Sequence, residues 1–251
     1  MSAAVRDDVV LYEPLLHPEV PDTEYKRVLR LPIDLPWTDT MLERALHARE
    51  WFARHARPWL FARTVAVDKV VAADGFALEG TRFRSRVVAG RIRGCTHALV
   101  VVASAGPEAV VESARLWAAE EPDRYYFLEC FASATVEALL SEARARLCAR
   151  AESRGEALLP QNSPGHPGWD VSEQPALFAV ATARGSVALP GPLEVLDSGM
   201  PHPRASQLAL FGLTTAGDPA AMHAGHTPCR NCSWMRCDLR REPFLHPLRA
   251  S

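Results

Sequence analysis

The stretch PQNSPGHPGWDVSEQPALF, from Pro160 to Phe178, carries a strong local structural signal. A proline fixes φ near −65° and a glycine accepts positive φ, so Ser163-Pro164-Gly165 predicts a tight turn. Pro167-Gly168 repeats the same chemistry, and the backbone is therefore expected to fold back on itself over about six residues. The stretch predicts a compact loop between two ordered elements.

A helix start is predicted directly after these turns. Asp170 or Ser172 can act as the N-cap, and Pro175 suits the first turn, where its missing N–H costs nothing. A compact loop at a helix N-terminus leaves backbone N–H groups free to hold an anionic or polar ligand. The alternative is a surface loop without a ligand.

Three segments resemble, in order and spacing, the activation domain of cobalamin-dependent methionine synthase. Ser163–His166 is similar to that family's SPGY-type loop, which takes part in binding S-adenosylmethionine. Phe131–Glu137 resembles a helix of small residues that ends in Val-Glu. LEVLDSGMPHPRASQLALFG, from Leu193 to Gly212, resembles a strand-and-loop segment of the family. The similarity runs from about Pro14 to Leu213.

The resemblance implies an α+β fold, a single curved domain with a twisted, mainly antiparallel sheet and flanking helices. This domain is expected to span residues 1–213, and a Cys-rich C-terminal tail residues 214–251. The irregular order of strand-like and helix-like segments also favours a mixed sheet over a doubly wound parallel one. The chain contains neither GxGxxG nor GxxxxGK[ST], which disfavours the common nucleotide-binding enzymes.

Hydrophobic periodicity and turn residues predict the individual elements. In the first half these are a loosely held tail over residues 1–13, a short strand over Tyr25–Leu31, a helix from Thr38 or Asp39 to about Arg57, short strands or hairpins over residues 63–89, a buried strand over His97–Ser104 and a helix from there to about Glu121. In the second half they are an ordered segment over Tyr125–Cys130, a long helix from Phe131 to about Ser153, a helix from about Ser172 to Arg184-Gly185 and a strand over Leu193–Leu196. On the long helix, Arg144, Arg146 and Arg150 are expected to form a solvated basic face rather than a nucleic-acid site.

Composition sets limits on the function classes. The 28 Lys and Arg residues nearly balance the 30 Asp and Glu residues, so nothing in the overall charge indicates nucleic-acid or membrane binding. No apolar run approaches the roughly 18 residues of a membrane-spanning helix. The N-terminus MSAAVRDDVV has acidic residues where a signal peptide is basic. We expect a cytoplasmic protein whose six cysteines are thiols or metal ligands.

S-adenosylmethionine has an ammonium, a carboxylate, a sulfonium and an adenine, and the resemblance assigns residues to these groups. Glu137 matches the family glutamate that takes the ammonium; its alternative is a helix-surface glutamate. Gln161 replaces the family arginine, which should weaken carboxylate binding by about 1–3 kcal/mol. His166 replaces the family tyrosine and could stack on adenine or titrate near neutrality.

Further polar and aromatic contacts are expected around these positions. Asn162 and Ser163 offer weak polar contacts, with backbone groups of Ser163 and Gly165. Phe211 is either a base-stacking face or a core residue. Asp197 and Arg204 are additional candidates, and Arg204 is a possible source of the positive charge that Gln161 lacks.

The chemistry implied by the resemblance needs no protein nucleophile. A reduced corrinoid attacks the sulfonium methyl, and the protein brings donor and acceptor together. No DxHxxG corrinoid-binding signature occurs in the chain. The cobalamin is therefore expected on a partner, a methionine synthase or another corrinoid protein, with a flavodoxin or ferredoxin as electron donor.

A cluster of cysteines lies near the C-terminus. Cys229, Cys232 and Cys237 have the spacing C-x₂-C-x₄-C, which suits a chelating turn. Zinc would need a fourth ligand from His223, His226 or His246, whereas three cysteines alone suit a [4Fe–4S] cluster with one open iron. The other three cysteines are expected to be core or surface thiols.

Three functions remain open at this point. The first is an accessory protein that uses S-adenosylmethionine to remethylate a partner's corrinoid. The second is an iron–sulfur redox protein on the same scaffold. The third is a binding module that has lost the donor and carries a structural zinc.

Overall fold

The central strand of the sheet is β5, His97–Ser104, and its sequence explains this position. Every residue of HALVVVAS after the histidine is buried, so both faces of the strand must be covered. It pairs along its whole length with β2, Trp59–Ala72, and with β9, Ser206–Thr214, both antiparallel. This computed structural model describes residues 8–72, 75–183, 187–215 and Cys237.

The seven-stranded sheet has the order β4-β3-β2-β5-β9-β6, with β1 paired to β2. Its remaining strands are β1 Val9–Glu13, β3 Gly75–Leu78, β4 Thr81–Arg84 and β6 Ala157–Leu158. A separate hairpin joins β7, Glu194–Val195, to β8, Pro201–His202. All of these strand pairs are antiparallel. The predicted α+β fold with a mainly antiparallel sheet and flanking helices is confirmed.

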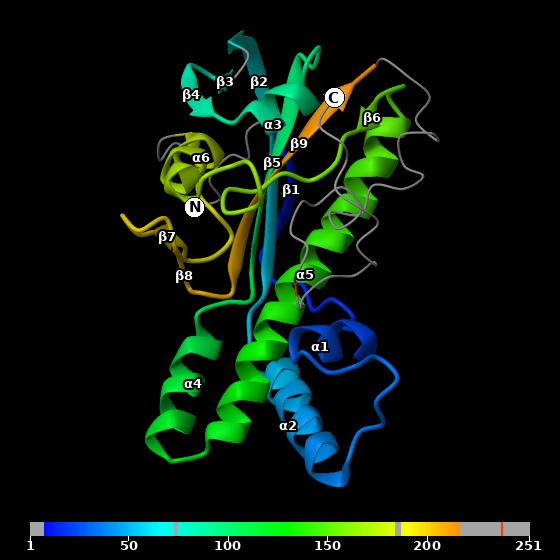
Figure 1. The fold of residues 1–251 in the computed structure, drawn as a ribbon, viewed down its shortest axis with the longest axis vertical. Helices are drawn as coiled ribbons and strands as arrows, with labels where there is room; N and C mark the ends of the chain where they lie inside the picture. Colours follow the sequence, from blue (N-terminus) through cyan, green and yellow to red (C-terminus); the bar gives the residue numbers. More distant parts are fainter. Residues whose placement is uncertain (1–7, 73–74, 184–186, 216–236, 238–251) are drawn as a thin grey trace.

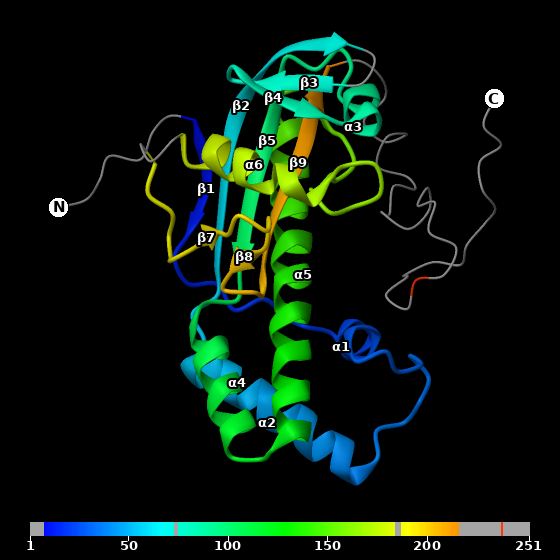
Figure 2. The ribbon, with the colours of Figure 1, turned by 60° about the vertical axis from the view of Figure 1, so that its left-hand side comes forward.

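Helices cover both faces of this sheet (Figures 1 and 2). The odd-numbered residues of Leu99–Ala103 pack in one core with α5, Pro122–Glu152. The even-numbered residues of Ala98–Val102 pack in a second core with α3, Arg86–Arg91, and α6, Gln174–Ala181. The period-two pattern of the strand thus separates two apolar cores.

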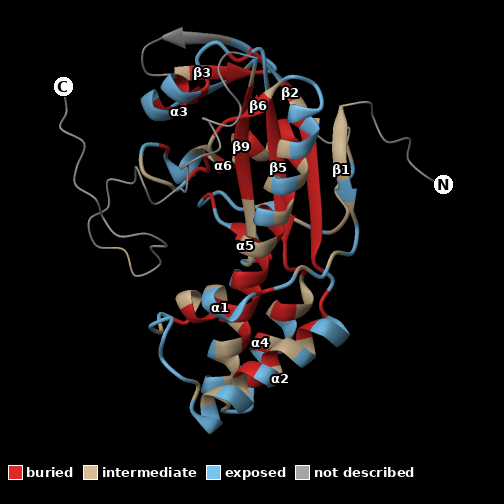
Figure 3. Cartoon of the chain, turned by 90° about the vertical axis from the view of Figure 1, so that its right-hand side faces the viewer, coloured by how far each residue is buried: buried red, intermediate tan, exposed pale blue. Residues whose placement is uncertain are grey.

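A helical end extends beyond the sheet (Figure 3). It contains α1 Asp22–Val28, α2 Asp39–His55 and α4 Glu108–Ala118, all packed on the first half of α5. Tyr25 is fully buried there, with its ring edge-on to Phe131, and its hydroxyl donates to the Phe127 carbonyl at 2.8 Å. This contact fixes α1 against α5.

The predicted break before Phe131 is wrong, because α5 is one helix of 31 residues. Pro122 occupies its first turn, where proline is tolerated. Its first half contacts helices and its second half contacts strands, so the buried side changes along its length. No single apolar stripe therefore marks it as one helix in the sequence.

Two N-terminal predictions are also wrong. Tyr25–Leu31 begins within the helix α1, which has Asp22 and Glu24 in its first turn and Lys26 and Arg27 in its last, as the helix dipole favours. The expected tail includes β1, whose Val9–Glu13 backbone adds an edge strand to β2. The region 63–89, where short strands or hairpins are expected, contains most of the single 14-residue strand β2 and the hairpin of β3 and β4.

Most other elements lie where the sequence predicts them. The helix α2 is capped by Thr38, whose Oγ1 accepts from the Met41 N–H at 3.3 Å. The strand over His97–Ser104 and the helix after Pro107 are both present. Among the described helices, none has the length and apolar character needed to cross a membrane.

Candidate functional site

The loop after β6 is hydrogen-bonded to the centre of the sheet. The Asn162 N–H donates to the Leu210 carbonyl at 2.9 Å, and the Leu210 N–H donates back to the Asn162 carbonyl at 2.7 Å. The buried Asn162 side chain donates to the Pro160 carbonyl at 2.9 Å and accepts from Arg91 Nη1 at 2.7 Å. These bonds hold the loop at β9 and connect it to α3.

The two predicted turns are present, but their backbone N–H groups donate to carbonyl groups of the loop itself. The Gly165 N–H donates to the Trp169 carbonyl, His166 to Ser163, and Trp169 to His166, at 2.9–3.0 Å. Asp170 caps the short 3₁₀ turn Val171–Glu173 that leads into α6, and its carboxylate accepts from the Ser172 N–H at 2.8 Å. The expectation that these N–H groups are free to hold an anion is therefore wrong, because the loop satisfies them internally.

Close packing explains the second glycine of the loop. Gly168 has φ of 89°, and a Cβ there would lie 2.5 Å from Val87 of α3. Its carbonyl accepts from Ser85 Oγ at 2.6 Å. The next residue, Trp169, packs edge-on to Phe76 and Phe83. The loop is fixed on three sides, by β9, by α3 and by the β3–β4 hairpin.

Glu137 lines a pocket between α1 and α5 with a volume of about 460 Å³, which we call the α1–α5 pocket. The α5 residues in it are Tyr126, Cys130, Ser133 and Glu137, at positions i, i+4, i+7 and i+11 of one helix face. Opposite them lie Arg27 and Val28 of α1, and Arg30. The pocket thus has a carboxylate and a phenol on the α5 wall and two arginines on the opposite wall.

Three side chains that line the α1–α5 pocket, those of Arg27, Arg30 and Cys130, set its chemistry. Arg27 makes an ion pair with Glu24 one turn earlier. Arg30 has φ of 60°, in the left-handed region, where it ends α1 while the Leu31 N–H donates to the Lys26 carbonyl at 2.9 Å. Burial raises the pKa of the Cys130 thiol to about 11, so this group is a neutral thiol at neutral pH.

The structure brings Glu137 within electrostatic range of His166 in the loop. Burial lowers the pKa of His166, and the negative charge of Glu137 opposes this by raising it, while Arg91 lowers it further. His166 is therefore a neutral imidazole at neutral pH, in electrostatic contact with a carboxylate of α5 and a guanidinium of α3. Glu137 lies at the boundary between the α1–α5 pocket and the loop.

The other loop residues have mutual contacts. The Gln161 amide donates to Ser163 Oγ at 3.3 Å, and the Gln207 amide donates to the same oxygen at 3.4 Å. Ser163 is buried, whereas Gln161 is half-buried. Gln161 is thus bonded to a neutral side chain, and Asn162 connects the guanidinium of Arg91 to the loop.

Three expected residues lie elsewhere. Phe211 is fully buried in the core with α5, which corresponds to the core alternative. Arg204 pairs with Glu129 at 3.0 Å, two helical turns before Glu137, so the expectation that it supplies the missing charge is wrong for this conformation. Asp197 lies exposed in the turn between β7 and β8 and does not line the α1–α5 pocket.

The cysteine cluster lies mostly outside the described residues. This applies to Cys229 and Cys232 and to the three histidines considered as fourth ligands. Cys237 is described and half-buried. Among the described residues, no group of three or more His, Cys, Asp or Glu side chains has metal-site geometry.

Sequence reasoning missed the residues that face Glu137 and the loop. Arg27 and Arg30 were hidden by the strand predicted over Tyr25–Leu31. Arg91 lies on a six-residue helix with no motif of its own. The stripe of Tyr126, Cys130, Ser133 and Glu137 was visible in principle, since polar residues at i, i+4, i+7 and i+11 share one helix face.

Comparison with known proteins agrees with this fold. No protein-family model matches the chain, and no curated protein matches its sequence. A solved structure described as the MetH reactivation domain bound to AdoHcy superposes with a TM-score of 0.55 at 9% sequence identity. The superposition covers 78% of this chain and 74% of that one. At so low a sequence identity, the superposition shows that the two chains share a fold.

Proposed function

We propose that this protein binds S-adenosylmethionine, and its product S-adenosylhomocysteine, with the amino-acid end of the ligand at Glu137. The observation that carries the proposal is that Glu137 lines one pocket together with Arg30 and also acts electrostatically on His166 of the loop. The similar fold of the MetH reactivation domain, which was solved with AdoHcy, supports it.

The α1–α5 pocket matches the charges of an α-amino acid. Glu137 offers a carboxylate to the ammonium, and Arg30 offers a guanidinium to the carboxylate, which it can bind through two parallel hydrogen bonds. The volume of about 460 Å³ falls within the usual 300–1,000 Å³ of small-molecule sites. In this arrangement Arg30 replaces the cation that Gln161 lacks.

The neutral state of His166 favours a sulfonium ligand. A protonated imidazole would repel the positive sulfur, and burial keeps His166 neutral at neutral pH. Glu137 adds a negative charge on the same side. The boundary between pocket and loop is therefore suited to a cationic group, whereas the wall formed by Arg27 and Arg30 is suited to an anion.

The proposal includes a role in reductive methylation or reactivation of a corrinoid. Cobalamin supplies the methyl acceptor and is carried by a partner of the methionine synthase type, while a flavodoxin or ferredoxin-type donor supplies the electron. This chain's residues bind and orient the methyl donor. Cys229, Cys232 and Cys237 are proposed to hold a zinc ion or an iron–sulfur cluster.

Calorimetric titration with S-adenosylmethionine and S-adenosylhomocysteine tests the proposal. We expect saturable binding at a stoichiometry of one, and a loss of about tenfold to a hundredfold for Glu137→Gln, because the ammonium loses a charged acceptor. Glu152→Gln at the exposed end of α5 is the matched control and should bind as the native protein does. Absence of binding by the native protein, or equal affinity in Glu137→Gln, would refute the proposed site.

Arg30→Gly tests the orientation of the ligand. Glycine accepts the φ of 60° without strain, so stability should stay equal or rise by up to about 1 kcal/mol, while affinity falls about tenfold. Arg91→Gln provides the comparison. A large loss in Arg91→Gln together with none in Arg30→Gly would place the ligand carboxylate at the loop and reject its placement at Arg30.

A further inference from the structure

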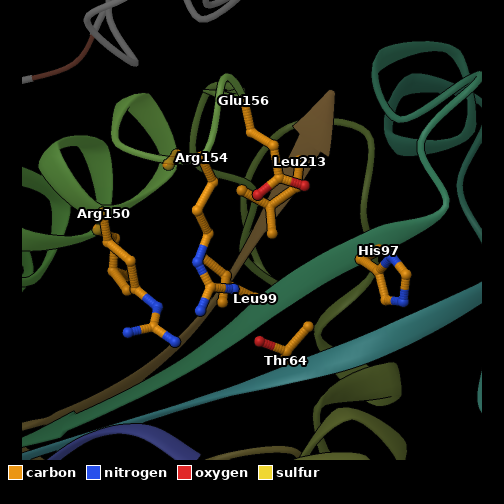
Figure 4. A pocket seen from close by; sticks show the side chains of 9 residues that line it. Thr64, His97, Leu99, Arg150, Arg154, Glu156 and Leu213 are labelled. Carbon is orange, nitrogen blue, oxygen red and sulfur yellow. The ribbon is translucent and has the colours of Figure 1, made fainter. Parts of the chain in front are cut away.

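A second pocket lies at the other end of α5 (Figure 4). Its volume is about 200 Å³, and it opens between the last turns of α5 and the β2–β5–β9 part of the sheet. We call it the arginine pocket. Its lining residues are Thr64, His97, Leu99, Leu147, Arg150, Ala151, Arg154, Glu156 and Leu213.

The two guanidinium groups of this pocket are not used in the fold. Arg146, one turn before Arg150, pairs with both Glu13 and Glu142. By contrast, the guanidinium groups of Arg150 and Arg154 make no ion pair and no hydrogen bond within the part of the chain that the structure describes. Two like charges on one side of a pocket repel each other, and no ion pair with another described residue relieves this repulsion.

Attraction to the helix C-terminus explains part of this arrangement. Cations are favoured in the last turn of a helix, where Arg150 lies. Arg154, however, follows the end of α5 at Glu152, and Figure 4 shows both side chains reaching along the same side of the pocket toward the strands. Thr64 of β2 adds a hydroxyl on the strand side, and its side chain has no hydrogen bond to another described residue. Three donors thus line the pocket, from α5, from the segment that follows it and from β2.

The pocket also has an apolar floor. Leu99, Leu147 and Leu213 are buried core residues whose side chains line it. Glu156 extends beside Arg154 and over Leu213, whereas His97 stands on the side away from the arginines (Figure 4). A bare inorganic ion would leave the apolar floor uncovered, whereas an organic anion would cover it and place its charge at the arginines.

We propose that the arginine pocket binds a small organic oxyanion, a phosphate monoester or a carboxylate with a compact apolar body. Arg150, Arg154 and Thr64 hold the oxyanion, and the three leucines contact the apolar body. The volume of about 200 Å³ lies below the usual range of drug-sized sites, which limits the ligand to a small molecule. The site is separate from Glu137, since the 13 residues to Arg150 span about 20 Å of helix.

The probes for this site are phenyl phosphate and benzoate, each titrated by calorimetry and by NMR of the ¹⁵N-labelled full chain. Two control compounds each carry half of the probe. Inorganic phosphate has the charge without the ring, and benzyl alcohol has the ring without the charge. We expect at least one of the two complete probes to bind saturably and at least tenfold more tightly than both halves. Binding of phenyl phosphate alone identifies a phosphate ligand, and binding of benzoate alone a carboxylate.

Variants locate the binding. Arg150→Gln and Arg154→Gln should each weaken the probe about tenfold, and Thr64→Val should weaken it less, because a neutral hydrogen bond is lost instead of a charge-assisted one. Arg82→Gln is the control, since Arg82 is an exposed arginine on β4 at the other edge of the sheet. The proposal is overturned if neither complete probe binds, if inorganic phosphate binds as tightly, or if Arg82→Gln weakens binding equally. Glu137→Gln should leave probe binding unchanged, which keeps this result independent of donor binding.

Discussion

The carboxylate of Glu137 on α5 raises the pKa of His166 in the loop, against the stronger lowering effect of burial. Two residues separated by 29 positions thus share one electrostatic environment, at the boundary of the α1–α5 pocket. We expect the His166 pKa to lie below its ordinary value of 6.5 and to fall further in Glu137→Gln. NMR titration of the imidazole measures both values; an unchanged value in the variant would show that the two groups do not interact.

The same shift predicts a dependence of stability on pH. The unfolded chain binds a proton at His166 near pH 6.5, whereas the folded chain binds it only at lower pH. Stability is therefore complete above pH 6.5 and decreases as the pH falls from there through the lowered folded-state pKa. Denaturant unfolding from pH 7.5 to 5 should show this decrease, and His166→Gln should reduce it. A variant as sensitive as the native protein in this window would contradict the assignment.

Gln161→Arg should leave the affinity for S-adenosylmethionine within about twofold of the native value. The proposed site places the ligand carboxylate at Arg30, and Gln161 does not line that pocket, so a guanidinium at position 161 should add no bond to the carboxylate. Gln161→Lys is a useful comparison, because it adds the charge without the planar fork. Calorimetry measures both, and a gain of about tenfold in the arginine variant would instead place the carboxylate at the loop.

Phe211→Leu should reduce stability and leave ligand affinity unchanged. The ring is fully buried in the core between β9 and α5, so its loss leaves a partly filled space and costs about 1–2 kcal/mol. Urea unfolding gives the free-energy change, and calorimetry on the folded variant gives the affinity. A selective loss of affinity at native-like stability would instead return Phe211 to the binding site.

Gly168→Ala should destabilise the protein by about 1–3 kcal/mol. The residue has positive φ, and its new Cβ would lie 2.5 Å from Val87, so strain and overlap add. Gly94→Ala is the control, because Gly94 has φ of 84° but no atom within 4 Å of the added Cβ. Thermal unfolding of both should show the larger loss for Gly168→Ala. Equal losses would mean that α3 moves away from the loop at little cost.

The sequence predicted well the parts whose signals are local. The strand over His97–Ser104 has an unbroken apolar run, and the turns around Gly165 and Gly168 follow from proline and glycine chemistry. Both signals act within a few residues and do not depend on the rest of the chain. The resemblance then supplied what local patterns lack, the mainly antiparallel character of the sheet and the interpretation of Glu137 as a ligand-binding residue.

The elements that the sequence did not predict correctly depend on tertiary contacts. The helix α5 buries one side against helices and another against strands, so its continuity past Cys130 has no single periodic signal. The helix α1 is seven residues long and depends on the contacts of Tyr25 with α5. Because α1 was predicted as a strand, the guanidinium of Arg30 could not be placed opposite Glu137.

Because α5 is one uninterrupted helix, it sets the separation between the two candidate ligand sites. Its 31 residues extend over about 46 Å, with one pocket against its early turns and the other against its last. The two proposed ligands would therefore bind without steric competition, at a spacing set by the length of one helix. Saturation of either pocket should leave the stoichiometry at the other equal to one.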